Sequence, residues 1–300
     1  MASGPAAQRP DLPKHPPAPP LSDAPLAPGL YLVATPIGNL RDITLRALDV
    51  LNAADLVLAE DTRVAGRLLG HYGISRPLER YDEHAAARAR PKVLALLEAG
   101  GRVALTSDAG TPLVSDPGYR LVVEALEAGA DVWPIPGASA VLAALTVAGL
   151  PTDRFQFVGF SPVKSAARRT FFEALTSTQA TLIFYESGPR LAGCLADMAA
   201  VFGDRPAAVA RELTKLHETV VRGGLANLAE DPRLQAPKGE IVVLVGAGAA
   251  VAATLEDADV ALTEAMTRLS VAEAAGEVAK ALGRPRRDLY RRALELKGAL

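Results

Sequence analysis

Acidic, glycine and small polar residues follow four short apolar runs in the first half of the chain. The segments that follow these runs are residues 35–40, 60–63, 107–118 and 136–140. Each run has the length and composition of a buried strand, and stretches with helical spacing separate the runs, which predicts parallel strands. The carboxyl ends of parallel strands meet at one edge of their sheet, where open α/β sheets bind ligands. The four segments therefore predict a ligand site at that edge.

Segment 107–118 is the most informative of the four. Gly110 and Gly118 allow backbone conformations that a side chain would forbid, and Pro112 stiffens the loop. Exposed amides and carbonyls there could bind the polar parts of a small cofactor, with Asp108 accepting hydrogen bonds from a ribose or an amine. The alternative is an ordinary strand-to-helix loop in which Asp116 caps the next helix. The sequence has neither G-x-G-x-x-G nor G-K-[S/T], which excludes the usual dinucleotide and nucleoside triphosphate sites.

Two carboxylates and a guanidinium lie within four residues, at Glu60, Asp61 and Arg63. One interpretation is that Glu60 or Asp61 accepts a proton while Arg63 binds a phosphate group. The alternative is that Asp61 or Thr62 caps the start of a helix. The spacing alone leaves both interpretations open.

The overall charge does not indicate nucleic-acid binding, because 34 acidic residues offset 32 basic ones. A local basic cluster lies between residues 284 and 297, where six arginines and lysines stand against two acidic residues. The cluster suits a surface that contacts phosphate, and it equally suits a solvated helix face. The single cysteine, Cys194, excludes an intrachain disulfide and a multi-cysteine zinc site, and it fits a reducing compartment.

The apolar pattern predicts the fold class α/β, with two α/β domains and a helical segment after them. A hydrophobic content of 49% in 300 residues can build a large core. Strands are expected at residues 30–34, 56–59, 103–106, 132–135, 155–158, 181–185, 207–211, 219–222 and 240–245. Helices are expected at residues 43–54, 62–70, 91–97, 118–128, 139–148, 168–175, 191–202, 257–268, 271–282 and 286–296.

The expected domain boundaries follow from composition and from the change in pattern at Pro136–Gly137. Residues 1–28 hold nine of the 23 prolines and predict a disordered or polyproline tail. The other units are an N-terminal α/β domain over 29–136, a C-terminal α/β domain over 137–248 and a helical, RNA-contacting extension over 249–300. Prolines and glycines interrupt the uncharged stretch at residues 132–152, and glycines interrupt a shorter one at 241–255, so we expect a soluble, cytoplasmic protein.

Seven segments resemble, in order, the signatures of the bacterial 16S rRNA (cytidine-2′-O)-methyltransferases of the tetrapyrrole methylase superfamily. The similarity runs from Gly29 to about Gly246 and continues more weakly through the terminal helices. One departure is Gly188-Pro189-Arg190, where that family often has histidine before the arginine. The seven segments are residues 35–40, 59–63, 107–112, 115–118, 136–140, 184–187 and 211–215.

The resemblance implies two α/β domains that hold S-adenosylmethionine in a cleft between them. It implies methylation of the ribose 2′-hydroxyl of a cytidine in the decoding region of 16S rRNA, by a homodimer that needs no metal. The substrate would be 16S rRNA or the small ribosomal subunit. The residues implied to bind the cofactor are Pro36, Ser107, Asp108, Ala109, Gly110, Thr111, Pro112, Val114, Pro136, Gly137, Ser139, Tyr185, Ala210, Leu213 and Gly239.

Methyl transfer to a ribose hydroxyl also needs a proton acceptor and contacts to RNA phosphates. Glu60 and Asp61 are the expected proton acceptors, because they end a strand that faces the cleft. Two other classes of function remain open, namely a small-molecule methyltransferase that acts on a tetrapyrrole and a non-catalytic RNA-binding relative. The expected RNA contacts are Arg63, Lys164, Arg168, Arg169, Lys215, Arg286 and Arg287.

Overall fold

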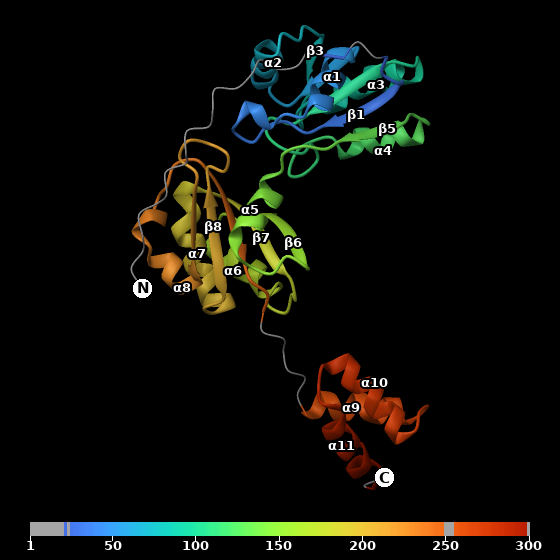
Figure 1. Ribbon diagram of the computed structural model, residues 1–300, viewed down its shortest axis with the longest axis vertical. Helices are drawn as coiled ribbons and strands as arrows, with labels where there is room; N and C mark the ends of the chain where they lie inside the picture. The colour runs from blue at the N-terminus through green and yellow to red at the C-terminus, as the bar shows by residue number, and fades with distance from the viewer. Residues whose placement is uncertain (1–20, 23–24, 249–254, 299–300) are drawn as a thin grey trace.

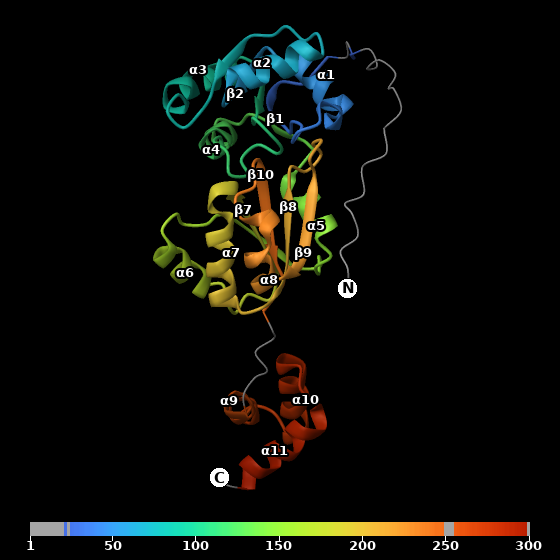
Figure 2. The same cartoon turned by 90° about the vertical axis from the view of Figure 1, so that its left-hand side faces the viewer.

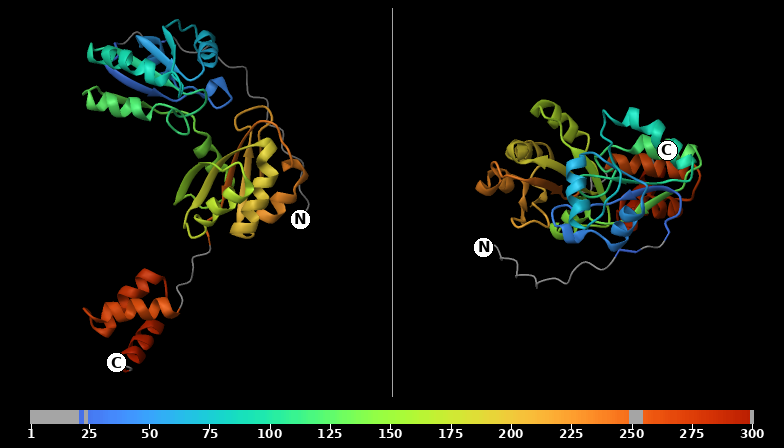
Figure 3. Two further views of the ribbon diagram at one scale, coloured as in Figure 1. Left: turned by 180° about the vertical axis from the view of Figure 1, so that it is seen from behind. Right: turned by 90° about the horizontal axis from the view of Figure 1, so that it is seen from above.

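The computed structural model describes residues 21–22, 25–248 and 255–298. This part of the chain holds two five-stranded sheets, each covered by helices, and a bundle of three further helices (Figure 1). The bundle lies apart from both sheet domains in the side views (Figures 1 and 2, and Figure 3, left). None of the helices in the described ranges is long and apolar enough to cross a membrane.

The first sheet has the strand order β3-β2-β4-β1-β5, and all its strands are parallel. Helices α1 and α2 pack on one face of the sheet, and α3 and α4 pack on the other. The 3-10 helix η1, Leu40–Asp42, precedes α1. The strands are β1 (Gly29–Val33), β2 (Leu56–Ala59), β3 (Leu78–Arg80), β4 (Arg102–Thr106) and β5 (Val132–Ile135), and the helices are α1 (Leu45–Ala53), α2 (Thr62–His71), α3 (Ala86–Glu98) and α4 (Tyr119–Glu127).

The second sheet is mixed and has the order β6-β7-β10-β8-β9. Strands β6 and β7 are parallel, whereas the pairs β7–β10, β10–β8 and β8–β9 are antiparallel. Helix α5 covers one face, and α6, α7 and α8 cover the other. The strands are β6 (Phe155–Phe160), β7 (Thr181–Ser187), β8 (Pro206–Arg211), β9 (Thr219–Gly224) and β10 (Glu240–Val245), and the helical elements are α5 (Ala140–Ala148), α6 (Ser165–Glu173), α7 (Gly188–Phe202), α8 (Leu225–Glu230) and the 3-10 helix η2 (Pro232–Leu234).

The three terminal helices, α9 (Leu255–Met266), α10 (Val271–Leu282) and α11 (Arg286–Gly298), share a separate small core of alanine, leucine and valine side chains. A capping box between Ser270 and Glu273 starts α10, because each residue satisfies a backbone N–H of the other. Gly283 ends the same helix in the left-handed conformation, with φ 62°.

The expected α/β class is confirmed, and the structure corrects several details of it. Strand β3 and helix α8 were not expected, and the second sheet is largely antiparallel. Helix α3 begins at Ala86, so Pro91 lies inside it rather than at its start. Most of the predicted proline-rich tail, 1–20 and 23–24, lies outside the described residues. Its last part contacts the first domain, since the Tyr31 hydroxyl donates a hydrogen bond to the Ala27 carbonyl over 2.7 Å.

Candidate functional site

Hydrogen bonds join the four turns at the carboxyl edge of the first sheet. Thr35 and Gly110 exchange two backbone hydrogen bonds of 2.8 and 3.1 Å, and the Thr35 hydroxyl donates to the Ser107 carbonyl. The Thr111 hydroxyl donates to the Ala138 carbonyl over 3.2 Å. The Asp61 amide donates to the Asp108 carboxylate over 3.0 Å. These contacts confirm that the segments after the strands converge on one edge.

Strand ends of the second sheet lie next to these turns of the first domain. The carboxyl ends of β6, β7 and β8 lie beside the amino end of β10, because β10 runs antiparallel to its two neighbours. A cavity of about 350 Å³, which we call the interdomain cavity, has walls from both domains. It is lined by Ile37, Ala109, Ala140, Phe160, Tyr185, Glu186, Ser187, Ala210, Leu213, Gly239, Glu240, Ile241 and Val242.

A smaller cavity of about 140 Å³ adjoins the interdomain cavity. The two share four wall residues, Ala109, Ala140, Phe160 and Tyr185. We call this smaller space the side cavity. Its other lining residues are Gly110, Thr111, Val114, Ser115, Asp116 and Ser139.

Aromatic and small side chains form the walls of the interdomain cavity. Phe157 and Phe160 contact the Tyr185 ring edge-on, with centroids 4.8 and 5.5 Å away, which holds the tyrosine in place. Small residues such as Ala210 also line the cavity and leave room for a ligand. Gly239 adopts φ +100°, a conformation that favours glycine, so the backbone itself forms part of the wall.

Two loops at this cleft contain strained backbone. Leu113 and Ser115 have φ of 73° and 66°, and Glu212 and Thr214 have φ of 52° and 67°. These four are the non-glycine residues with positive φ in the described ranges. Such strain costs about 1–3 kcal/mol per residue and concentrates at functional sites. The loops that bear it come from opposite sides of the cleft.

Asp116 is an acidic residue of the side cavity, and the environment raises its pKa to about 6. Burial is the main cause, and the carboxylates of Glu60 and Asp108 add to it. The pKa of Glu60 is also raised, first by burial and then by Asp108 and Asp82. Asp116 does not cap α4, because that helix begins at Tyr119, its N-cap residue is Gly118, and no side chain caps it.

The Asp61 side chain caps the N-terminus of helix α2. Its carboxylate accepts the Arg63 backbone N–H over 2.8 Å and pairs with the Arg63 guanidinium at 2.6 Å. These contacts with Arg63 lower the pKa of Asp61 well below its usual range. A carboxylate that is capped and paired in this way is a poor proton acceptor, so the structure favours the capping interpretation of Asp61.

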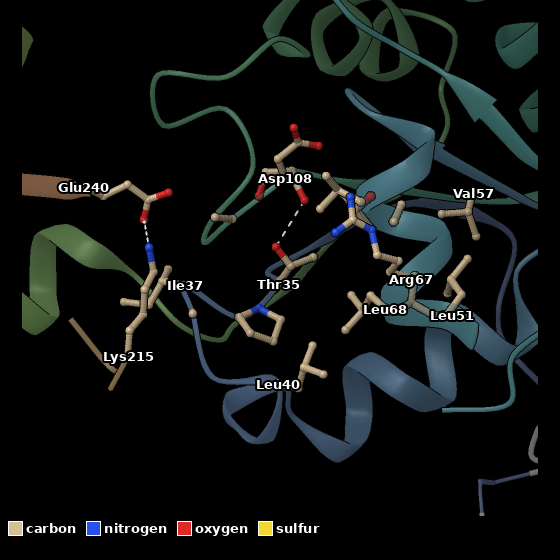
Figure 4. Close-up of a pocket in the computed structure, with 18 residues that line it drawn as sticks. Thr35, Ile37, Leu40, Leu51, Val57, Arg67, Leu68, Asp108, Lys215 and Glu240 are labelled. Atoms are coloured by element: carbon tan, nitrogen blue, oxygen red, sulfur yellow. Dashed lines mark hydrogen bonds and ion pairs between the residues drawn. The ribbon is translucent and has the colours of Figure 1, made fainter. Parts of the chain in front are cut away.

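A larger cavity of about 570 Å³ lies within the first domain and opens toward the cleft (Figure 4). We call it the N-terminal cavity. Helix α2, η1 and the turn after β1 form its walls, and Lys215 and Glu240 reach it from the second domain. The Lys215 ammonium pairs with Glu240 at 2.9 Å and with Glu212 at 2.8 Å.

The sequence matches a family described as Tetrapyrrole (Corrin/Porphyrin) Methylases over residues 29–229, which is more than half of the chain. The chain belongs to the tetrapyrrole methylase family. A second match, to the RsmI C-terminal HTH domain, covers residues 252–297. The first match therefore covers the first sheet domain and the second one as far as α8, and the second match covers the helical bundle of the methylase.

Curated relatives resemble the methylase over nearly its whole length. The ribosomal RNA small subunit methyltransferase I of Mesorhizobium japonicum is 55% identical, with 91% of this chain and 94% of the relative covered. The protein of the same name from Erythrobacter litoralis is 54% identical, with 92% and 98% covered. That of Escherichia coli O157:H7 is 46% identical, with 90% and 96% covered.

Solved structures support the fold at lower identity. Diphthine synthase superposes with a TM-score of 0.58 at 18% identity, covering 72% of this chain and 89% of that one. Uroporphyrin-III-C-methyltransferase from Thermus thermophilus gives 0.52 at 24% identity, covering 72% and 93%. These similarities show a shared two-domain fold.

Most residues predicted to bind a cofactor in the methylase line one of the three cavities. Pro36, Ser107 and Asp108 line the N-terminal cavity. Pro112, Pro136 and Gly137 line none of them, although Gly137 packs closely on Ala34 beneath the turn. The residues that line the interdomain or side cavity are Ala109, Gly110, Thr111, Val114, Ser139, Tyr185, Ala210, Leu213 and Gly239.

Sequence reasoning missed several lining residues of the methylase. Phe160 gives no chemical signal in the sequence, because apolar residues at strand ends are common. Ile37 and Ala140 lie within the segments 35–40 and 136–140, and Glu240 follows Gly239, so their place beside predicted residues was the available signal. Asp116 was considered only as a helix cap.

The structure contradicts the prediction that Arg168 contacts RNA. The Arg168 guanidinium is buried and pairs with the buried Asp197 at 2.5 Å, so it cannot reach a phosphate outside. Arg169 pairs with the same aspartate over 2.7 Å but remains half exposed. The sequence could not reveal this, because Asp197 lies on α7, 29 residues away.

The other predicted RNA contacts are more accessible. Arg63 is exposed and paired with Asp61, and Arg286 donates a hydrogen bond to the Ala272 carbonyl. Lys164 and Arg287 are exposed, and no ion pair is found for either among the described residues. Lys164 lies four residues after Phe160, the last residue of β6, which lines the interdomain cavity, whereas Arg287 lies on α11 in the separate bundle.

Proposed function

We propose that the methylase transfers a methyl group from S-adenosylmethionine to the ribose 2′-hydroxyl of a cytidine in 16S rRNA. The observation that carries the proposal is the interdomain cavity, whose walls come from both domains. The similarity supports it, because the chain is up to 55% identical to enzymes named ribosomal RNA small subunit methyltransferase I. The site would act in the cytoplasm, on the rRNA or on the small ribosomal subunit.

The interdomain cavity suits the proposed donor in shape and polarity. Its apolar walls, including Leu213 and Val242, fit an adenine ring, and Tyr185 offers an aromatic face. Gly110 packs closely on Ile37, because a Cβ at Gly110 would lie 3.2 Å from Ile37 Cγ2, and its φ of +85° favours glycine. A volume of about 350 Å³, extended by the side cavity, is within the range of small-molecule sites.

The charge of the site also suits the donor. S-adenosylmethionine, when bound, supplies a methyl carbon attached to a positively charged sulfur. Asp116 and Glu240 line the two adjoining cavities, and Glu60 and Asp108 lie close enough to raise the pKa of Asp116. Such a set of carboxylates favours a cation over an anion.

The ribose hydroxyl must lose a proton, and a nearby carboxylate can accept it. Because the Asp61 carboxylate caps α2 and pairs with Arg63, we retain only Glu60 of the two predicted proton acceptors. We add Asp116 as a second candidate. Both have raised pKa values, and an acceptor works best when its pKa lies near the working pH. Holding the hydroxyl and the methyl carbon in line is the larger contribution, worth roughly 7–11 kcal/mol in favourable cases.

RNA contacts and assembly complete the proposal. Lys164 and Arg63 near the cleft, with Arg287 on α11, would neutralise phosphates. We also propose that the methylase forms a homodimer, which the exposed apolar side chains Leu142 and Val147 on α5 support. Light scattering of the full chain in solution would measure its mass directly.

A transfer assay tests the proposed function. The full chain is incubated with S-adenosylmethionine that carries a labelled methyl group, together with small ribosomal subunits, free 16S rRNA or a precursor tetrapyrrole. We expect label in the rRNA of one of the first two and none in the tetrapyrrole. Label in the tetrapyrrole alone would support the small-molecule class, and donor binding without any transfer would support a non-catalytic relative.

A further inference from the structure

The N-terminal cavity is larger than the proposed donor site and has a different lining. Leu40 from η1 and Leu68 from α2 lie on its apolar walls (Figure 4), and Pro36 also lines the cavity. Leu68 is almost fully buried, whereas Leu40 is 41% exposed although it is large and apolar. An apolar slot of this kind, open at one end, suits a flat ring.

One strong hydrogen-bond donor also lines this cavity. The guanidinium of Arg67 extends from α2 toward the turn that holds Thr35 (Figure 4). Arg67 is exposed, and neither an ion pair nor a hydrogen bond of its side chain is found within the described ranges. Arg63, one turn earlier on α2, is instead paired with Asp61. The guanidinium of Arg67 is therefore available to a ligand.

The N-terminal cavity and the interdomain cavity share a border. Ile37, Ala109 and Glu240 line both of them. A ring held between Leu40 and Leu68 would thus have its attached groups close to the Ala109 side of the cleft. This is where a sugar must lie if its hydroxyl is to meet a donor in the interdomain cavity.

We propose that the N-terminal cavity receives the target nucleotide with its base unstacked from the RNA, and that Arg67 reads the Watson–Crick edge of cytosine. This inference rests on the proposed function and adds the location and the specificity of the substrate site. Proteins that recognise RNA sequence commonly bind unstacked bases and contact this edge.

The chemistry of the guanidinium selects the base. Arginine only donates hydrogen bonds. Cytosine presents two neighbouring acceptors, O2 and N3, whereas uracil carries a hydrogen at N3 that would face the guanidinium donors. The slot accordingly favours cytosine over uracil, and the apolar contacts of Leu40 and Leu68 add affinity without distinguishing the two.

Nucleotide binding to the full chain tests the proposal without depending on methyl transfer. Ligand-observed NMR, with S-adenosylhomocysteine present, measures the affinities of cytidine and uridine 5′-monophosphate. We expect the cytidine nucleotide to bind about tenfold more tightly, and Arg67→Met to remove that preference. Arg88→Met is the matched control, since Arg88 is an exposed arginine on α3, across the sheet from α2.

Two further variants separate the base contact from other contacts. Arg67→Lys keeps the charge but not the planar fork, so it should lose the preference for cytosine. Leu40→Ala should weaken both nucleotides alike, whereas Leu45→Ala, which alters an exposed leucine outside the cavity, should change neither. If Arg67→Lys still binds the cytidine nucleotide as selectively as the unaltered chain does, another residue distinguishes the two bases, and the assignment to Arg67 is overturned.

The outcomes distinguish this inference from the proposed function. Equal binding of the two nucleotides, no binding to the unaltered chain at millimolar concentration, or displacement of the nucleotide by S-adenosylhomocysteine would each overturn the inference. Unchanged transfer to cytidine by Arg67→Met would do so while leaving the proposed function intact. Selective nucleotide binding without transfer to any rRNA would instead refute the proposed function alone.

Discussion

The side chain of Lys215, in the second domain, packs directly against Gly38 of the first domain. A Cβ atom placed on Gly38 would overlap with Cγ of Lys215, and Gly38 itself adopts φ +150°. The ammonium of the same lysine pairs with Glu212 and Glu240. One residue therefore joins the two domains at the mouth of the N-terminal cavity, where the proposed substrate would enter.

Replacing Gly38 with alanine should disturb this junction. We expect Gly38→Ala to lower kcat/KM for rRNA and to lower the free energy of unfolding by about 1–2 kcal/mol, because the side chain meets Lys215 and the backbone conformation favours glycine. Transfer kinetics and denaturant unfolding measure the two effects. Gly70→Ala is the control, since nothing lies within 4 Å of a Cβ there. A Gly38→Ala protein with unaltered kinetics would refute the role of the junction.

Asp116 should make the stability of the fold depend on pH. Its pKa rises from 3.8 to about 6 on folding, so the folded state binds the proton more tightly than the unfolded state. The free energy of unfolding should therefore fall as the pH rises from about 4 to about 6. Because the side chain is only partly buried, we expect a fall of about 1–2 kcal/mol. Asp116→Asn should abolish this fall, as thermal unfolding across the pH range would reveal.

The two neighbouring carboxylates after β2 should respond differently to amide substitution. Asp61→Asn should retain transfer activity, because asparagine also caps helices well. Glu60→Gln should lower kcat by roughly 10²–10⁴-fold if Glu60 is the main proton acceptor, with donor affinity little changed. Single-turnover kinetics with calorimetry of donor binding separates the two effects. Loss of turnover in Asp61→Asn alone would restore the proton-accepting role to Asp61.

The buried and the exposed arginines should also differ. Arg168→Met should lower the free energy of unfolding by about 3 kcal/mol, because it leaves Asp197 buried with fewer partners. Arg287→Met should leave stability unchanged and reduce the slope of log affinity against log salt by about 0.7 for single-stranded RNA. Denaturant unfolding and RNA binding at several salt concentrations measure these effects. An unaltered salt slope would remove Arg287 from the RNA surface.

Local signals in the sequence were sufficient for most of the fold. The bounds of β2, β5, β10 and α10 agree with those expected, because each is a compact apolar run or a capped amphipathic stretch. Strand β3 was missed since it has only three residues, two of them charged. The antiparallel direction of β10 depends on pairing with β7 and β8, which lie far away in the chain.

The candidate site was predictable where it depends on strand ends and less so where it depends on distant contacts. The 107–116 loop could be located because it follows β4 directly. The burial of Arg168 by Asp197 and the approach of Phe160 to Tyr185 arise from tertiary packing between separate segments. The N-terminal cavity was not anticipated, because its apolar walls resemble ordinary core residues in the sequence.

Locating the transferred methyl group tests the central claim most directly, namely that the two domains hold a methyl donor against a ribose hydroxyl of RNA. The full chain is supplied with S-adenosylmethionine bearing a deuterated methyl group and with small ribosomal subunits, and the rRNA is then digested to nucleosides for mass spectrometry. We predict a single labelled product, cytidine methylated on its 2′-oxygen. Label on a nucleobase, or rRNA without label although the donor binds, would contradict the account.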